Sequence, residues 1–425
     1  MSPRGRRFRP VAALTVASSL LLAACGGGAG SQSAAPSGSA AASGGGGGGT
    51  AETLTIGAAL PLTGALAPNG KEQHDGYELW KNKVNDQGGF KVGDKTYKVD
   101  IKYYDYESDT TTAVKLVEKL ITEDKVQALL GPYGSGATVA SAAVAEQYGV
   151  PMLSPSASAA DVFSKGYTFL FGTLVSTPAS AKQILDFAKS LSPEPKTIGL
   201  ITRNDLFPIA QGKAIVDAAQ AAGLKVVYNV QFPPDPTDLS TPLLGAKNAN
   251  PDMLFGLGYV NDLILMTKQA KELGVKPKAF LQTAGPSHYS YIPALKDTAN
   301  GILTADWWAP QLNYSDGGKL FGKAQDYADD FQKAYNYPPS YVSASATACG
   351  YLIQLAMEKA GSIEPDKVRE ALTKIDDDTF YGHIKFNENG QNIGTPIVIE
   401  QIENQKIVTV FPEDVATQKA EYPLQ

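Results

Sequence analysis

The sequence predicts an α/β protein made of two doubly wound lobes, each a parallel sheet with helices on both faces. Strand-like and helix-like segments alternate with short turns from residue 53 onward, and such alternation is typical of parallel sheets. The alternation restarts near Ala179, which favours two sheets over one very wide sheet. The body of the chain is also long enough to split into two lobes.

The first run of elements is expected between residues 53 and 154. Its helices carry apolar residues at helical spacing, such as Val114, Val117 and Ile121, and Gly88-Gly89 ends the first of them. The predicted strands are 53–60, 98–104, 126–130 and 150–154, and the predicted helices are 71–86, 110–122 and 137–148.

The second run begins with a helix and continues in the same alternation. Its predicted helices are 179–190, 208–222, 238–248 and 261–273, and its strands are 197–202, 225–230, 252–257 and 278–282. After a short segment at 301–305, helices are expected at 319–336, 342–360 and 365–375, with strands around 380–386, 395–402 and 405–411. Asn387–Gly390 predicts a turn, and Asp376–Asp378 is expected to be a solvated turn rather than a calcium site.

The N-terminal segment predicts export and lipid anchoring. Four arginines precede the apolar run from Val11 to Leu22, which is about a dozen residues long and too short to span a bilayer of ~30 Å. Leu22-Ala23-Ala24-Cys25 resembles a bacterial lipobox. We therefore expect residues 1–24 to be a signal peptide, Cys25 to carry lipid, and residues 25–51 to be a flexible Gly/Ser tether. The protein is then expected at the outer face of the cell membrane or in the periplasm.

Composition narrows the class of partner. Cleavage before Cys25 removes four arginines and no acids, so the formal charge changes from −6 to −10. An acidic body argues against nucleic acid or an anionic membrane as partner. Only Cys349 then remains as a free thiol, so no intramolecular disulfide is possible, and its apolar setting predicts a buried, inert side chain.

The stretch Leu130–Thr138 is the main candidate for ligand binding. A buried strand leads through a glycine loop into a helix, and a helix start offers unpaired N–H groups and partial positive charge to an anion. Ser135 and Thr138 add hydroxyl groups. The spacing fits neither the dinucleotide fingerprint, the phosphate loop nor a hydrolase nucleophile elbow. A carboxylate pocket fits best, and a tight turn without a ligand is the alternative.

A second loop and an aromatic pair add weaker candidates. Leu153–Ala159 also follows a strand and carries small hydroxyl side chains, so neighbouring strand ends would bring it close to the glycine loop. Trp307-Trp308 either stacks on a ligand or packs between the lobes. His74, His288 and His383 show no metal-ligand spacing, so no metal and no cofactor are expected.

Several short stretches occur in an order typical of one family. They are Pro61–Gly64, Val84–Gly89, Tyr104–Asp109, Leu130–Thr138 followed by Tyr148–Ser154, and Phe380–Gly382 with Ile384–Phe386. With these stretches, residues 52–412 resemble the branched-chain amino acid-type solute-binding proteins of ABC importers. The resemblance implies the type I periplasmic binding protein fold, with three hinge crossings near 172–177, 299–304 and 378–383. It places lobe 1 at 52–174 plus 302–380 and lobe 2 at 175–301 plus 381–425.

The resemblance also implies where a ligand binds. Ser135 matches a serine that holds the ligand head, and Tyr259 and Phe207 match second-lobe aromatics that close over the ligand. The full set of expected ligand-binding residues is Asn69, Ser135, Gly136, Ser156, Ala157, Ser158, Phe207, Tyr259 and Trp307.

One position departs from the pattern of the family. Amino acid binders of this type place a glutamate after the strand that ends near Gln282, where this chain has Ala284. A buried ammonium without a carboxylate would be costly. Either another acid such as Asp205 or Asp262 pairs with the ammonium, or the ligand is a carboxylic acid or amide without one.

The resulting interpretation is a monomeric, lipid-anchored solute-binding protein with no catalytic residues. It would close on a small polar organic molecule and deliver it to a membrane permease. A ligand sensor that presents its closed form to a receptor is the alternative, and an exported serine hydrolase is disfavoured because no base–nucleophile motif is present.

Overall fold

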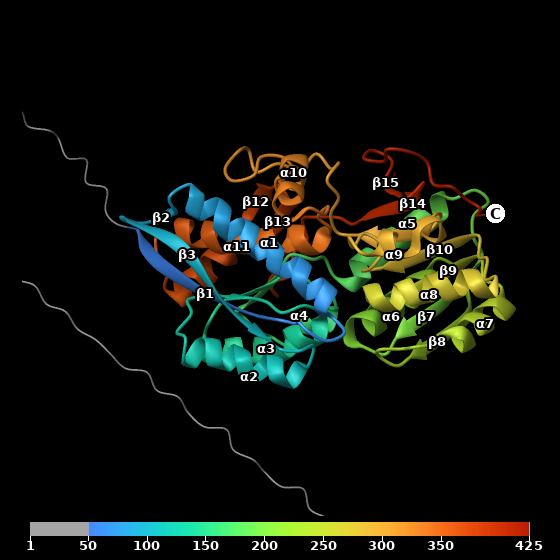
Figure 1. The fold of residues 1–425 in the computed structure, drawn as a ribbon, viewed down its shortest axis with the longest axis horizontal. Helices are drawn as coiled ribbons and strands as arrows, with labels where there is room; N and C mark the ends of the chain where they lie inside the picture. The colour runs from blue at the N-terminus through green and yellow to red at the C-terminus, as the bar shows by residue number, and fades with distance from the viewer. Residues whose placement is uncertain (1–50, 425) are drawn as a thin grey trace, which may run out of the picture. The chain divides into compact units, whose positions relative to one another are not determined.

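The computed structural model describes residues 51–424, which contain two large sheets and a small hairpin (Figure 1). The predicted signal peptide, Cys25 and nearly all of the predicted tether lie outside the described residues. Six of the nine predicted ligand-binding residues lie on elements packed with the first large sheet, and the other three, Phe207, Tyr259 and Trp307, follow strands of the second.

The first sheet has six strands in the order β2-β3-β1-β4-β5-β6. All neighbours are parallel except β2, which is antiparallel to β3 at the edge. Because a parallel sheet needs helical crossovers, both faces are covered, α2 and α3 packing together on one and α1 and α11 on the other. The strands are β1 (Glu52–Leu60), β2 (Phe90–Val92), β3 (Lys95–Asp105), β4 (Leu129–Leu130), β5 (Met152–Ser154) and β6 (Leu170–Gly172).

The helices of the first lobe come from two distant parts of the chain. They are α1 (Ala67–Asp86), α2 (Thr110–Thr122), α3 (Ser135–Tyr148), α4 (Ala160–Phe163), α10 (Ala324–Tyr335), α11 (Tyr341–Ala360) and α12 (Pro365–Leu372). Helices α1 and α11 lie side by side. Their close approach depends on Gly350, where a Cβ atom would collide with the indole of Trp80. Helix α11 is apolar and buried over most of its length, so it forms the centre of this core.

The second sheet has seven strands in the order β15-β14-β11-β10-β9-β7-β8. Strands β7 to β11 are parallel, and β14 and β15 add an antiparallel edge. The predicted fold class is confirmed. The strands are β7 (Thr197–Arg203), β8 (Lys225–Phe232), β9 (Met253–Leu257), β10 (Ala279–Thr283), β11 (Leu303–Asp306), β14 (Val398–Glu403) and β15 (Lys406–Phe411). The helices are α5 (Thr177–Ser190), α6 (Leu206–Ala221), α7 (Ser240–Ala249), α8 (Val260–Leu273), α9 (Tyr291–Leu295) and the 3-10 turn η1 (Lys296–Ala299).

The strand pairing differs from the predicted lobe ranges at two boundaries. Strand β11 pairs with β10 and β14, so residues 303–306 belong to the second sheet although the sequence assigned 302–380 to lobe 1. The hairpin of β12 (Asp376–Thr379) and β13 (Gly382–Lys385) is followed by a bridge from Gln391 to Gly172 of β6. The chain therefore stays with the first sheet beyond residue 381. Both differences arise because pairing between distant segments leaves no local signal.

Two predicted elements are wrong in detail. The helix expected at 319–336 begins only at Ala324, because the Asp316 carboxylate accepts the backbone N–H groups of residues 318–322 and holds them in a loop. Asp376–Asp378 is strand β12 rather than a turn, and Lys385 of the facing strand pairs with Asp376. The predicted turn at 387–390 is confirmed by the Gly390 N–H bond to Asn387 O.

Candidate functional site

Two loops at the carboxyl ends of β4 and β5 form one continuous wall, which we call the serine loops (residues 131–138 and 154–159). Ser135 Oγ accepts the backbone N–H groups of Ser158 and Ala159, each at 3.3 Å. Ser156 Oγ accepts the N–H of Gly134 at 2.9 Å and donates to Pro132 O at 3.2 Å. The sequence prediction that these loops lie together is confirmed, but their hydroxyl groups are largely used to hold each other.

The serine loops also present the start of α3. Its N-cap, Gly134, has a φ of 85°, and no side chain caps the helix. The first N–H groups of α3 and its partial positive charge are therefore available to an anion. A cavity of about 440 Å³ borders this helix start and is lined from the first lobe by Gly134 and Gly136 and from the second by Arg203, Asp205 and Tyr259.

Arg203, the last residue of β7, neutralises the acids on the second-lobe side of this cavity. Its Nη1 donates to Asp262 Oδ1 at 2.9 Å, and its Nε lies 3.6 Å from Asp205 Oδ2. Asp262 also accepts the N–H of Tyr259, and Asp205 caps α6 through the N–H of Leu206. Both acids that the sequence offered as partners for a ligand ammonium are thus occupied by Arg203 and by helix capping.

Five aromatic rings run in a chain across the cleft between the lobes. Successive ring centroids are 5.7 Å apart from Tyr133 to Tyr259, 6.4 Å to Phe207, 6.0 Å to Trp307 and 4.8 Å to Tyr341. Tyr133 and Tyr341 come from the first lobe, Tyr259 and Phe207 from the second, and Trp307 from the crossing after β11. All five rings are buried. The chain therefore supplies an apolar surface that both lobes share.

Polar atoms without partners gather at the ends of β10 and β11 and at the first turns of α1. We call this group the unpartnered wall. Within residues 51–424, hydrogen-bond partners are lacking for both amide atoms of Asn69, for Glu72 Oε2, for both carboxylate oxygens of Asp306, and for Thr283 Oγ1, Ser287 Oγ, His288 Nε2, Thr304 Oγ1 and Trp307 Nε1. Buried polar groups are normally hydrogen-bonded, so this concentration marks a place where a bound molecule or water completes the bonding.

The acids of this wall have strongly perturbed pKa values. Burial raises the pKa of Glu72 to about 7, although Ser340 and Ser343 donate to its other oxygen. Burial raises the pKa of Asp306 to about 6, and the pKa of the adjacent Glu400 is raised by burial and by the Asp306 carboxyl. Two carboxyls in contact cannot both ionise readily. Such shifts cluster at functional sites.

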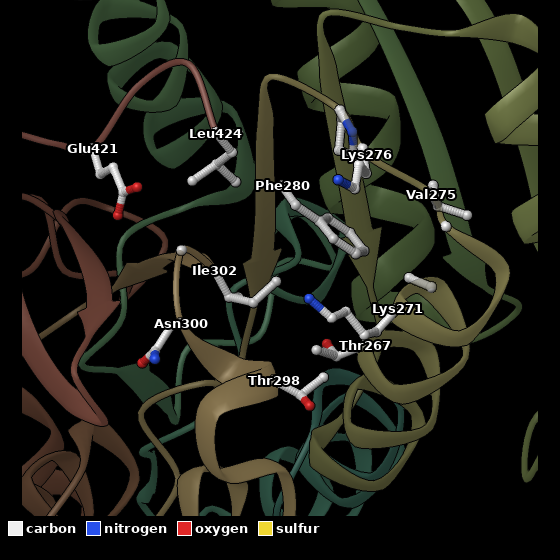
Figure 2. A pocket seen from close by; sticks show the side chains of 14 residues that line it. Thr267, Lys271, Val275, Lys276, Phe280, Thr298, Asn300, Ile302, Glu421 and Leu424 are labelled. Atoms are coloured by element: carbon white, nitrogen blue, oxygen red, sulfur yellow. The ribbon is translucent and has the colours of Figure 1, made fainter.

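A second hollow of about 300 Å³ lies away from the cleft, between α8, β10 and the C-terminal tail. Figure 2 shows Phe280 and Lys271 beside Ile302, with Leu424 and Glu421 of the tail at its border. It contains none of the predicted ligand-binding residues, so the cleft remains the candidate site.

Comparison with known proteins identifies the family. A family model described as periplasmic binding protein matches residues 53–406. The chain belongs to the periplasmic binding protein family. Its members are binding proteins, so the prediction of a binding protein rather than an enzyme is confirmed, and membership implies a location outside the cytoplasm.

Relatives of this periplasmic binding protein include Leu/Ile/Val-binding protein homolog 8 of Brucella abortus (strain 2308), 29% identical over 388 residues that cover 86% of this chain and 92% of the relative. Among solved structures, LivJ of Streptococcus pneumoniae in complex with isoleucine has a TM-score of 0.75 at 24% identity, covering 85% of this chain and 100% of that one. A solute-binding protein of an ABC transporter from R. palustris in complex with benzoate has a TM-score of 0.73 at 18% identity, covering 87% and 98%.

In this periplasmic binding protein, the predicted site residues fall into three groups. Ser135, Gly136, Ser156, Ala157 and Ser158 lie together in the serine loops. Tyr259, Phe207 and Trp307 lie in the aromatic chain, and Asn69 belongs to the unpartnered wall. Their contact with a ligand stays a prediction. The two tryptophans separate, since Trp308 is a core residue whose Nε1 donates to Phe380 O.

Several residues of the candidate site are absent from the set predicted from the sequence, among them Glu72, His288, Asp306 and Tyr341. Glu72 lies three positions after Asn69 on the same helix, which places both on one face, and Asp306 directly precedes the tryptophan pair. These two positions in the sequence were the signals that could have pointed to Glu72 and Asp306. At the position of the missing family glutamate, β10 ends at Thr283 and Ala284 has a φ of 64°.

The remaining features outside the cleft are structural. Cys349 is buried and free, and burial raises the pKa of its thiol. Across residues 51–424, no group of three or more His, Cys, Asp or Glu side chains is arranged to hold a metal ion. Among the described helices, none combines the length and apolar character needed to cross a bilayer.

Proposed function

We propose that this periplasmic binding protein is the receptor of an ABC importer, which captures a small polar organic molecule between its lobes and delivers it to a permease. The ligand class is an amino acid or a related carboxylic acid or amide. The lobes correspond to the two sheets, and the three crossings between them act as hinges.

The observation that carries the proposal is the uncapped start of α3. Its free N–H groups border the 440 Å³ cavity, and the opposite side of that cavity belongs to the second lobe. A carboxylate bound there would accept the unpaired N–H groups at the start of α3. The helix start favours an anion by ~0.3–1 kcal/mol, or more when the site is partly buried. The aromatic chain beside it suits the apolar part of the same molecule.

Relatives support the ligand class. The Brucella relative is named for leucine, isoleucine and valine, one solved neighbour holds isoleucine, and another holds benzoate. An aliphatic or aromatic side chain beside a carboxylate is common to all of these molecules, and it matches a cleft with a helix start at one end and aromatic rings along its length.

Contacts between the lobes explain how binding would become closure. Asn261 Nδ2 at the start of α8 donates to Ala65 O before α1 at 3.1 Å, and Tyr133 packs edge-on against Tyr259. These contacts exist only where the lobes meet. A ligand that touches both lobes binds the closed state more tightly than the open state and so shifts the population toward it. The closed form is the one a permease would recognise.

We also propose that lipid on Cys25 keeps the receptor near its permease, the Gly/Ser tether allowing the body to reach it. A sensor that presents its closed form to a receptor uses the same cleft. ATP hydrolysis by the reconstituted permease on addition of the loaded protein distinguishes transport from sensing.

The test of the proposed function is a binding panel. The twenty amino acids, 4-methylpentanoate and benzoate are added to the purified protein, and unfolding temperature and calorimetric affinity are measured. A true ligand stabilises by ~2.7 kcal/mol at a hundredfold excess over its Kd. Tyr259→Ala should weaken binding at least tenfold, whereas the matched variant Tyr148→Ala, on the exposed face of α3, should not. If no compound stabilises the protein, or both variants bind equally, the proposal is wrong.

A further inference from the structure

We infer that Asp306 and Glu400 share one proton beside two of the hinge crossings, and that closing the lobes takes up this proton from solvent. Ligand binding would then weaken as the pH rises. This inference rests on the proposed function, because it concerns the closure that a ligand brings about. It adds a pH-sensitive device to the fold and holds for any ligand that closes the lobes.

The two carboxyls are brought together by the pairing of β11 with β14. In this antiparallel pair, Thr304 lies opposite Glu400, and Asp306 lies two residues further along β11. Asp306 and Glu400 therefore point to the same face of the sheet as diagonal neighbours. Both side chains are buried, so their carboxyls meet inside the protein rather than at its surface.

A proton is needed between these two groups because nothing else compensates two negative charges there. Both Asp306 oxygens lack a hydrogen-bond donor among residues 51–424, while Gln311 Nε2 donates to Glu400 Oε1 at 3.3 Å. Among the described residues, the groups that act most strongly on the two carboxyls include no lysine, arginine or histidine. Two carboxylates in contact cannot both stay ionised, whereas a carboxylic acid donates its O–H to a neighbouring carboxylate. The shared proton thus supplies the hydrogen bond that Asp306 otherwise lacks.

The surroundings of the pair also favour the protonated form. Burial raises the pKa of Asp306 to about 6, and the negative charge of Glu72 on α1 acts in the same direction. The hydroxyls of Ser287 and Thr304 act in the opposite direction but carry no charge. Burial and the Asp306 carboxyl raise the pKa of Glu400. Because interacting carboxyls titrate in two steps, the pair holds one proton near neutral pH.

The first lobe covers the Asp306 side of the pair. Glu72 of α1 and Tyr341 of α11 lie within range of the Asp306 charge, as do Tyr133 and Tyr381, and burial raises the pKa of all three phenols, so they stay neutral. Opening the lobes would draw these groups away and admit water, which stabilises the ionised form of a carboxyl. The closed state therefore binds the proton more tightly than the open state, and closure takes up a proton.

Two of the three crossings between the lobes begin or end beside the pair. Trp307 directly follows Asp306 and starts the segment that leads to α10 in the first lobe. The chain returns between Gln391, just after the β12–β13 hairpin, and Val398, which begins β14. Repulsion between two ionised carboxyls would therefore act on both crossings and on the Trp307 ring of the aromatic chain. This position makes the pair a positioning device for closure and not only a buried acid pair.

The experiment counts the protons taken up when a ligand binds. L-leucine, 4-methylpentanoate and benzoate are titrated into the protein by calorimetry, in two buffers that differ in ionisation enthalpy, at several values between about pH 6 and pH 8, where the ligand carboxylates stay ionised. The compound that binds most tightly should be taken up with a net gain of protons. Its affinity should fall with rising pH, by about tenfold per pH unit for each full proton taken up.

Asp306→Asn and Glu400→Gln should each reduce the proton uptake and flatten the pH profile, because an amide N–H replaces the shared proton in either variant. Any uptake by Glu72 is common to all proteins compared and does not affect the difference between them. Asp217→Asn is the matched control, because it removes one carboxylate from the exposed face of α6, and it should keep the wild-type uptake.

Two outcomes separate this inference from the proposed function. If a compound binds but its affinity does not change with pH, or if both Asp306→Asn and Glu400→Gln keep the wild-type proton uptake, the inference is wrong while the proposed function stands. If none of the three compounds binds, the proposed ligand class fails and the inference fails with it.

Discussion

The serine loops and the unpartnered wall are joined by the aromatic chain from Tyr133 to Trp307 but are built in opposite ways. In the serine loops, the hydroxyls of Ser135 and Ser156 already hold backbone groups of the neighbouring loop. In the unpartnered wall, Thr283 and Asn69 are equally buried, and their side-chain polar atoms have no hydrogen-bond partner among residues 51–424. The hydroxyl groups of the serine loops are therefore satisfied in the free protein, and only the first N–H groups of α3 stay open there. The unpartnered wall, in contrast, has buried side chains that only a bound molecule or water can satisfy.

This difference predicts which substitutions lower the stability of the free protein and which leave its stability unchanged. Truncating a satisfied hydroxyl leaves its buried partners without a hydrogen bond and costs stability, whereas removing an unpartnered polar group removes a desolvation penalty. The free protein should thus tolerate changes in the unpartnered wall better than changes in the serine loops. Three predictions test this contrast, from the largest expected effect to the smallest.

The largest effect concerns Glu72 and pH. Its pKa is about 7 in the folded protein and 4.5 without burial, so the folded state binds the proton more tightly. Its contribution to stability is full below pH 4.5 and is lost as pH rises through 7. The stability of Glu72→Gln relative to wild type should therefore increase by ~3 kcal/mol between these pH values.

Denaturant unfolding of both proteins across this pH range measures the difference. The comparison with Glu72→Gln is needed because burial lowers the pKa of the adjacent His288 to about 4, which makes the folded protein less stable as pH falls. A difference between the two proteins that stays constant with pH would show that Glu72 does not titrate in this way.

The second prediction concerns the serine loops. Ser135→Ala removes the acceptor of the Ser158 and Ala159 N–H groups and should lower the free energy of unfolding by ~1–3 kcal/mol. Ser164→Ala, at an exposed serine that bonds only to Asp161 O, should change it by less than ~0.5 kcal/mol. Equal stabilities of the two variants in urea unfolding would contradict the view that the serine loops hold each other.

The smallest effect is expected when two buried threonines are compared, one without a hydrogen-bond partner and one with a partner. Thr283→Val replaces a buried, unpartnered hydroxyl by a methyl group and should leave stability unchanged or raise it by up to ~1 kcal/mol. Thr347→Val is the matched control, because that buried hydroxyl donates to Gly76 O at 2.7 Å, and it should cost ~1–3 kcal/mol. A loss of stability in Thr283→Val as large as that in Thr347→Val would remove the distinction between the two kinds of site.

The sequence predicted the features that depend on local patterns. Helical spacing and glycine stops revealed most of the long elements, and the strand–glycine–helix order at 130–138 revealed the serine loops. The lobe boundaries were harder to predict. Strand β11 belongs to the second sheet because it pairs with β14, whose residues lie about a hundred positions away. Local sequence does not encode such pairing.

The unpartnered wall was difficult for the same reason. Glu72 stands between Lys71 and Gln73 in the sequence and looks like an ordinary acid on a solvated helix. Its burial is caused by Ser340 and Ser343 on one side and His288 on the other, and these residues come from both lobes. The burial of Asp306 likewise depends on distant segments, because Ser287 and Glu400 lie beside it at the end of β11.

The central claim is that the start of α3 receives the carboxylate of the ligand. A crystal structure of the protein with the tightest-binding compound of the panel tests this claim most directly. The account predicts a carboxylate oxygen within 2.7–3.2 Å of the backbone N–H of Ser135 or Gly136, with Tyr259 covering the molecule from the second lobe. A carboxylate held by Arg203 at the rim, with the first turn of α3 facing only water, would contradict it.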